Sequence, residues 1–201
     1  MENIIFVAHP DDEIIWFSSL INQKNTLLVI CFDTISFDKQ KENLEHTNKF
    51  SKILKGYQKI LPVLWLKSPK VVSPKIFGKV DQRIKDILKE NIKSIINILE
   101  PKNIYTHNPW GEYGHSEHIL LHNILKELRK DILFPNIVLD RASEKKDYLE
   151  NIGNIKLVCS NKIDKNFRDN IINQYKDLNI LTIKGGIKFL FETEEFMQYL
   201  K

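Results

Sequence analysis

The sequence predicts an α/β protein: a single Rossmann-like domain over residues 1–201, with a largely parallel sheet and helices on both faces. Short apolar runs typical of buried strands alternate with longer segments whose apolar residues recur at helical spacing. A length of 201 residues suits one domain. Hydrophobic residues make up 42% of the chain and charged residues 28%, so folding can bury a full core without disulfides.

The predicted strands share a short run rich in Ile, Leu and Val. They lie at 3–8, 25–32, 61–66, 103–107, 136–140, 155–160 and 186–192. The first, NIIFVA, is continuously apolar, which is typical of a strand covered on both faces.

The predicted helices lie between these runs, at 12–23, 38–55, 79–99, 115–130 and 164–178. The clearest is 79–99, whose apolar residues keep a period near 3.6. Residues 67–78 contain two prolines and are predicted as a long loop.

Polar clusters follow two of the predicted strands. HPDDE (9–13) comes after the first strand, and HNPWGEYGHSEH (107–118) begins where the strand at 103–107 ends. In parallel α/β sheets, ligands bind beyond the carboxyl ends of the strands, near the switch point in strand order. We therefore expect the two clusters to meet at one edge of the sheet.

The three adjacent acids of the first cluster need a positive partner. Clustered carboxylates repel one another and are costly to desolvate, and a divalent cation reverses both effects. Five of the six histidines lie in the two clusters and the helix that follows. His9, Asp12 and one helix histidine would supply the three ligands of a catalytic zinc site that keeps a position open for water.

A simpler reading is available for the first cluster. Asp11 or Asp12 could cap a helix, with the acids complementing the helix dipole. That reading gives no role to His9 or Glu13, and it does not predict a second histidine cluster.

At this point the sequence resembles a known family. AHPDDE (8–13) and GHSEH (114–118) are similar to the motifs of the PIG-L/LmbE-like zinc-dependent de-N-acetylases. The resemblance implies a Rossmann-like fold and removal of acetyl groups from N-acetylglucosamine units. It also implies metal ligation by His9, Asp12 and His118. His122, one turn further along the predicted helix, is a rival ligand by position.

Three further residues are expected to act in catalysis. Asp11, beside the metal, fits the general base of hydrolysis, and the resemblance gives it the same role. His115 could protonate the leaving amine or stabilise an oxyanion, and Tyr113 could donate to the same oxyanion. An aromatic packing role for Tyr113 is the alternative.

Other residues of the two clusters have supporting roles in this reading. Trp110, Glu112 and His107 are candidates for substrate contact, against packing for Trp110 and a satisfied polar position for His107. Glu13 is expected to hold backbone N–H groups of its loop. Glu117, which replaces the aspartate of the common HPDH form, is expected to orient a ligand histidine.

The resemblance leaves the substrate open. Its strong part covers residues 1–35 and 101–125, and the segment 39–50 lacks the arginine of an arginine–glutamate pair that often contacts substrate in the family. The implied substrate is a small molecule or glycan bearing an N-acetyl group. Two alternatives remain: hydrolysis of a non-sugar acyl amide, and a non-catalytic Rossmann-like ligand-binding protein. The sequence argues against the second alternative, because the turn after the first strand has no glycine and so cannot form a glycine-rich ligand-binding loop.

Composition limits the partners and the compartment. A net charge of +4 with no basic arm disfavours a nucleic-acid function. No signal peptide or transmembrane segment is predicted, so we expect a cytoplasmic protein, and a homo-oligomer is compatible with the sequence. Cys31 and Cys159 lie in apolar runs and are predicted to be buried free thiols. The metal is expected to be Zn²⁺, although Fe²⁺, Co²⁺ or Mn²⁺ suits the same ligands.

Overall fold

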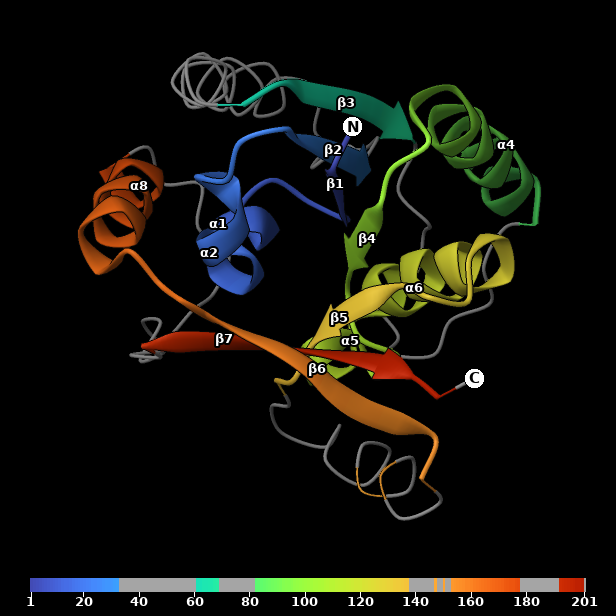
Figure 1. The fold of residues 1–201 in the computed structure, drawn as a ribbon. Coiled ribbons are helices and arrows are strands. Elements are labelled where there is room, and N and C mark those ends of the chain that lie inside the picture. The colour runs from blue at the N-terminus through green and yellow to red at the C-terminus, as the bar shows by residue number, and fades with distance from the viewer. Residues whose placement is uncertain are drawn as a thin grey trace.

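The computed structural model describes residues 1–32, 61–68, 82–137, 147, 150, 153–177 and 192–200 (Figure 1). Its strands are β1 (Asn3–Val7), β2 (Thr26–Phe32), β3 (Val63–Ser68), β4 (Asn103–Thr106), β5 (Leu133–Pro135), β6 (Ile155–Lys162) and β7 (Thr193–Tyr199). Its helices are α1 (Asp12–Trp16), α2 (Ser18–Ile21), α4 (Gln82–Leu99), α5 (Gly111–Gly114), α6 (Ser116–Leu128) and α8 (Lys165–Asp177). No described helix is both long enough and apolar enough to span a membrane.

The strands form one mixed, mostly parallel sheet in the order β3-β2-β1-β4-β5-β7-β6. The pairs β1–β2, β2–β3, β1–β4 and β4–β5 are parallel. The prediction of a largely parallel sheet is confirmed for these five strands, but β7 runs antiparallel to both β5 and β6. The strand order reverses direction between β1 and β4, so the switch point lies between these two neighbours.

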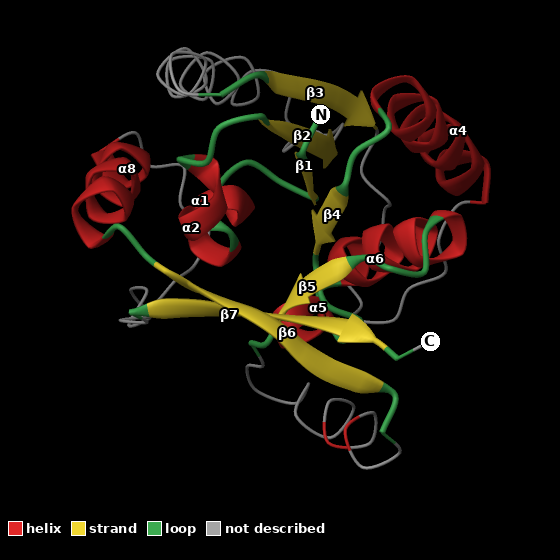
Figure 2. Ribbon diagram, in the orientation of Figure 1, coloured by secondary structure: helices red, strands yellow, loops and turns green. Residues whose placement is uncertain are grey.

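Helices cover both faces of the sheet (Figure 2), and the alternation of side chains along β1 explains why. Ile5 and Val7 face a core that also contains side chains of α1, α2 and α8. Ile4 and Phe6 face the opposite core, which is closed by α4 and α6. Every residue of β1 is buried, as its uninterrupted apolar sequence predicts.

Several element boundaries differ from the sequence prediction. The predicted helix 12–23 is broken at Phe17, whose φ of −138° and ψ of 23° are not helical, so two short helices form instead of one. β5 precedes the strand predicted at 136–140, and β7 follows the one predicted at 186–192. β3 continues through Ser68, into the predicted loop.

Some predictions fall outside the described residues: the helix at 38–55, the segment 39–50, the loop residues 69–78, and the strand residues 138–140 and 186–191. Both cysteines are free thiols; Cys31 is buried as predicted, whereas Cys159 is only partly buried.

Candidate metal centre and active site

The switch point brings the two polar loops together. Phe6 and Thr106 are register partners in β1 and β4, so the residues that follow these strands leave the sheet side by side. Ala8 N–H donates a hydrogen bond of 3.0 Å to His107 Nε2. The expected meeting of the loops at one sheet edge is thus seen directly in the hydrogen bonding.

Asp12 stands at the centre of this meeting point. It begins α1 and is 4% exposed. Its Oδ2 accepts a hydrogen bond of 2.7 Å from the His9 backbone N–H, and its Oδ1 accepts one of 3.2 Å from Trp16 Nε1. The Trp16 indole, four residues further along α1, thereby fixes the direction of the carboxylate.

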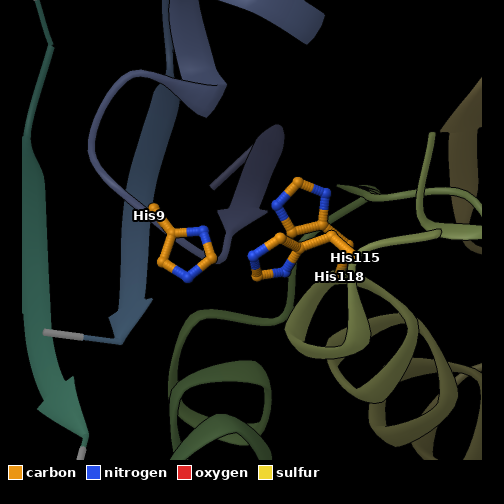
Figure 3. A group of neighbouring side chains, drawn as sticks. All are labelled: His9, His115 and His118. Atoms are coloured by element: carbon orange, nitrogen blue, oxygen red, sulfur yellow. The ribbon is translucent and has the colours of Figure 1, made fainter. Parts of the chain in front are cut away.

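His9 and His118 approach the same Asp12 oxygen from different elements. His9 Nδ1 and His118 Nε2 each lie 3.4 Å from Asp12 Oδ2. Figure 3 shows His9 on the loop after β1, opposite His115 and His118 at the start of α6. The ring centroids of His9 and His118 are 5.4 Å apart.

Each of these two histidines has a glutamate behind it. His9 Nε2 is 2.5 Å from Glu117 Oε2, and His118 Nδ1 is 2.6 Å from Glu112 Oε2. Because an ionised carboxylate only accepts hydrogen bonds, these two ring nitrogens carry the protons. The other nitrogen of each ring is therefore the one that faces Asp12.

The chemistry of this donor set fits a divalent cation. His118 Nε2 is fully buried, and among the described residues it has no hydrogen-bond partner. Two imidazoles, each backed by a carboxylate and aimed at a third carboxylate, form the arrangement found around protein-bound zinc. His9, Asp12 and His118 could therefore hold the ion that the sequence predicts.

The electrostatics of the candidate site favour positive charge. Burial lowers the pKa of His9 and His118, but the neighbouring carboxylates outweigh burial and raise both pKa values overall. Burial raises the pKa of the Asp12 carboxylate, but the neighbouring His118 and His107 outweigh burial and hold this pKa well below its usual value. An ionised carboxylate among buried rings attracts either protons or a metal cation.

Among the described residues, two overlapping groups of potential metal ligands are close enough to share an ion: His9, His115 and His118, and Asp12, His107 and His118. The predicted set of His9, Asp12 and His118 matches neither group as a whole and takes its members from both. Two of these residues, His107 and His115, are less suitable as ligands because a ring nitrogen of each already accepts a hydrogen bond. His107 Nε2 already accepts the Ala8 N–H, and His115 Nδ1 accepts a hydrogen bond of 3.3 Å from the Glu117 N–H. His118, which belongs to both groups, is the best-placed ligand.

His122 is engaged on both sides of its ring. Its Nδ1 lies 2.6 Å from the His107 carbonyl oxygen, and its Nε2 lies 2.8 Å from the Tyr199 hydroxyl. Neither nitrogen is aimed at Asp12. The geometry thus favours His118 over His122 as the ligand from α6.

Asp11 has an unusual backbone conformation. Its φ of 99° lies in the left-handed region that a residue with a side chain rarely adopts. Its N–H donates a hydrogen bond of 3.0 Å to Glu13 Oε2, and its carbonyl accepts from the Ile14 and Ile15 N–H groups. Asp11 is 4% exposed and directly precedes the candidate ligand Asp12.

Tyr113 and His115 border the candidate metal centre. The Tyr113 ring centroid lies 5.7 Å from that of His115 and 5.6 Å from that of His118, and the residue is 38% exposed. Partial burial, with the nearby acids, raises the pKa of Tyr113, so the phenol keeps its proton. Burial, with the charges of His118 and His9, lowers the pKa of His115 to about 2. Both side chains can donate a hydrogen bond while uncharged.

The structure places Glu112, His107 and Trp110 behind the site. All three are buried, and Glu112 Oε2 bonds to both His107 Nδ1 and His118 Nδ1. Trp110 Nε1 donates to the Ile137 carbonyl at 2.7 Å, so its indole is anchored away from solvent. Burial and these hydrogen bonds fit supporting and packing positions, and contact of these three residues with substrate stays a prediction.

Residues distant in sequence complete this support. The Tyr175 hydroxyl donates a hydrogen bond to Glu13 Oε1, and Tyr199 contacts His122 as described. Burial raises the pKa of Glu13 to about 7, although the Tyr175 hydrogen bond opposes this rise.

The spacing of Trp16 from Asp12 on α1 could have indicated their contact. No local pattern marks Tyr175 or Tyr199.

Comparison with solved structures reveals the same fold in known deacetylases. Three similar structures are a deacetylase–bog complex from the biosynthesis pathway of teicoplanin, the zinc-inhibited form of teicoplanin deacetylase Orf2, and the A40926 pseudoaglycone deacetylase Dbv21. They align with TM-scores of 0.65 at 11%, 11% and 12% identity, and each alignment covers 99% of this chain and 97% of the other. At this identity the likeness establishes the fold alone.

Comparison with curated proteins finds no match. The family model described as GlcNAc-PI de-N-acetylase, PIG-L, matches residues 4–128, which include both polar loops and more than half of the chain. The chain therefore belongs to the PIG-L family.

Proposed function

We propose that this chain is a metal-dependent hydrolase that removes the acetyl group from an N-acetylated amino sugar of the GlcNAc type, or its conjugate, releasing acetate. Family membership supports a hydrolytic de-N-acetylase. The observation that carries the proposal is the pair of glutamate-backed histidines, His9 and His118, each 3.4 Å from the same oxygen of Asp12.

The cofactor is proposed to be Zn²⁺ or another divalent ion, held by His9, Asp12 and His118. When bound, such an ion lowers the pKa of a water molecule and polarises the amide carbonyl. The carboxylates of Glu112 and Glu117 orient the two histidines and increase their basicity.

Asp11 is proposed as the general base, which accepts a proton from the attacking water. His115 receives a hydrogen bond on Nδ1, so its proton resides on Nε2, and this N–H can donate to the oxyanion. Tyr113 supplies a second donor. As the carbon–nitrogen bond breaks, the amine nitrogen needs a proton, and Asp11, which has taken a proton from the attacking water, is the candidate donor, while neutral His115 is left with the oxyanion role.

The first test replaces Asp11 by asparagine. We expect Asp11→Asn to retain stoichiometric metal, measured by elemental analysis, and to lose about 10³-fold of its deacetylation rate because the base is gone. The assay is acetate release from chitobiose-like and GlcNAc-conjugate substrates. Asp86→Asn, on the exposed face of α4, is the matched control and should keep full activity.

Full activity of Asp11→Asn would remove Asp11 from the mechanism. A panel of acylated thiol conjugates and amino-acid amides, tested with the wild-type protein, separates sugar deacetylation from hydrolysis of other amides. Absence of stoichiometric metal from the wild-type protein would overturn the proposed function itself.

A further inference from the structure

The geometry points to Tyr175, in α8, as a positioning residue that holds the general base Asp11 in place through Glu13. This inference rests on the proposed function, because it assigns a role to Tyr175 only if Asp11 is the base. Tyr175 lies outside residues 4–128, the part of the chain that matches the family model.

Two hydrogen bonds connect the three residues. The Tyr175 hydroxyl donates to Glu13 Oε1, and Glu13 Oε2 accepts the Asp11 N–H at 3.0 Å. Tyr175 and Glu13 are both 0% exposed, so water cannot replace either partner without a change in packing. The Glu13 carboxylate therefore links a distant helix to the backbone of Asp11.

Asp11 needs such a link because of its backbone. With φ at 99°, it adopts a conformation that persists only when its surroundings determine it. The Ile14 and Ile15 amides hold its carbonyl, while Glu13 holds its amide. If Glu13 lost its orientation, the peptide unit before Asp11 could rotate and carry the carboxylate away from its working position.

The packing of α8 fixes the tyrosine hydroxyl in turn. Tyr175 shares one face of α8 with Ile171 and Ile172, and all three belong to the core that contains α1 and α2. Figure 1 shows α8 beside these two helices. A ring held by this packing presents its hydroxyl to Glu13 at a defined place, which suits a positioning role.

The test removes only this hydroxyl, with Tyr175→Phe, and compares it with Tyr105→Phe, which removes the hydroxyl of another buried tyrosine of the same core. Hydrogen exchange of the Asp11 amide should become about tenfold faster in Tyr175→Phe, because its acceptor is no longer held. With metal loaded, kcat should fall about tenfold while KM and metal stoichiometry stay unchanged. Tyr105→Phe should change neither measurement.

A double-mutant cycle tests whether Tyr175 acts through Glu13. In the Glu13→Gln background, Tyr175→Phe should have little further effect on kcat or exchange; additive effects would overturn the inference. Equal exchange rates and equal kcat in Tyr175→Phe and Tyr105→Phe would also overturn the inference. So would a fall in kcat that is explained by lost metal, or by a variant that no longer unfolds cooperatively. An inactive wild-type enzyme would refute the proposed function, and amide exchange would still decide whether Tyr175 holds Asp11.

Discussion

The parallel and the antiparallel parts of the sheet contribute different things to the candidate site. The loops after β1 and β4, together with the helices that follow them (α1, α5 and α6), provide all of the proposed ligands and catalytic side chains. Among the described residues, α8 and β7 contribute contacts of another kind: Tyr175 to Glu13, Glu194 to Ser18 and Ser19, and Tyr199 to His122. The first part holds the reactive groups, and the second supports them from behind.

This difference between the two parts shows how the side chains of a site with clustered charge are held in position. Each of these three contacts ends on a residue near the proposed ligands or catalytic groups, or on the short helix α2. Such contacts can set orientation and stability without touching substrate. The comparison therefore predicts that substitutions in the two parts change different measured quantities.

The largest effect is expected for a proposed ligand. His118→Ala should lose more metal affinity than the 10–100-fold typical of removing an outer partner of a ligand, and deacetylation should disappear with the metal. Titration with Zn²⁺, followed by calorimetry, measures the change. His122→Gln, one turn further along α6, should keep the metal. Unchanged affinity in His118→Ala, or metal loss in His122→Gln, would contradict the assignment.

A smaller effect, on stability alone, is expected in the C-terminal part. Glu194 is 3% exposed and accepts four hydrogen bonds, from the N–H and hydroxyl groups of Ser18 and Ser19. Glu194→Ala leaves these donors unpaired and should lower the free energy of unfolding by about 2–4 kcal/mol. Urea denaturation measures this loss, with the exposed Glu192→Ala as control. Weakened metal binding in Glu194→Ala would contradict the prediction that this part affects stability alone.

The smallest effect is expected on the outer surface of the parallel part. Glu127 accepts hydrogen bonds from Lys89 and Lys85, at 2.7 and 3.0 Å, and these lower its pKa. A lowered folded-state pKa contributes stability above the unfolded value, and this contribution is lost as pH falls through the folded pKa. Because the pair is exposed, Glu127→Gln should cost at most about 0.5 kcal/mol at neutral pH and less in acid. Urea denaturation at several pH values measures it; a pH-independent loss would contradict the prediction.

Local sequence patterns were enough to predict β1, β2 and β4 of the parallel core. β1 and β2 are apolar after their first residue, β4 is the short run NIYT, and a polar cluster follows directly after β1 and β4. Such signals need no knowledge of distant residues. The convergence of His9, Asp12 and His118 near one point follows from the adjacency of β1 and β4 at the switch point.

The C-terminal part was harder to predict, because its structure depends on distant partners. β7 has the sequence TEEFMQY, whose acids are atypical of a strand, and pairing with β5 and β6 determines its place. The apolar run GIKFLFE just before it gave the stronger local signal. The contacts of Tyr175 and Glu194 likewise arise only after the chain has folded back on α1 and α2.

The separation of His9 and His118 along the chain has a consequence for thermal denaturation. The unfolded chain has no comparable cluster, so an ion held at the switch point would bind the native state in preference. Each tenfold increase in free ion above saturation would then add about 1.4 kcal/mol to the free energy of unfolding. The melting temperature would rise with ion concentration and fall when a chelator is added.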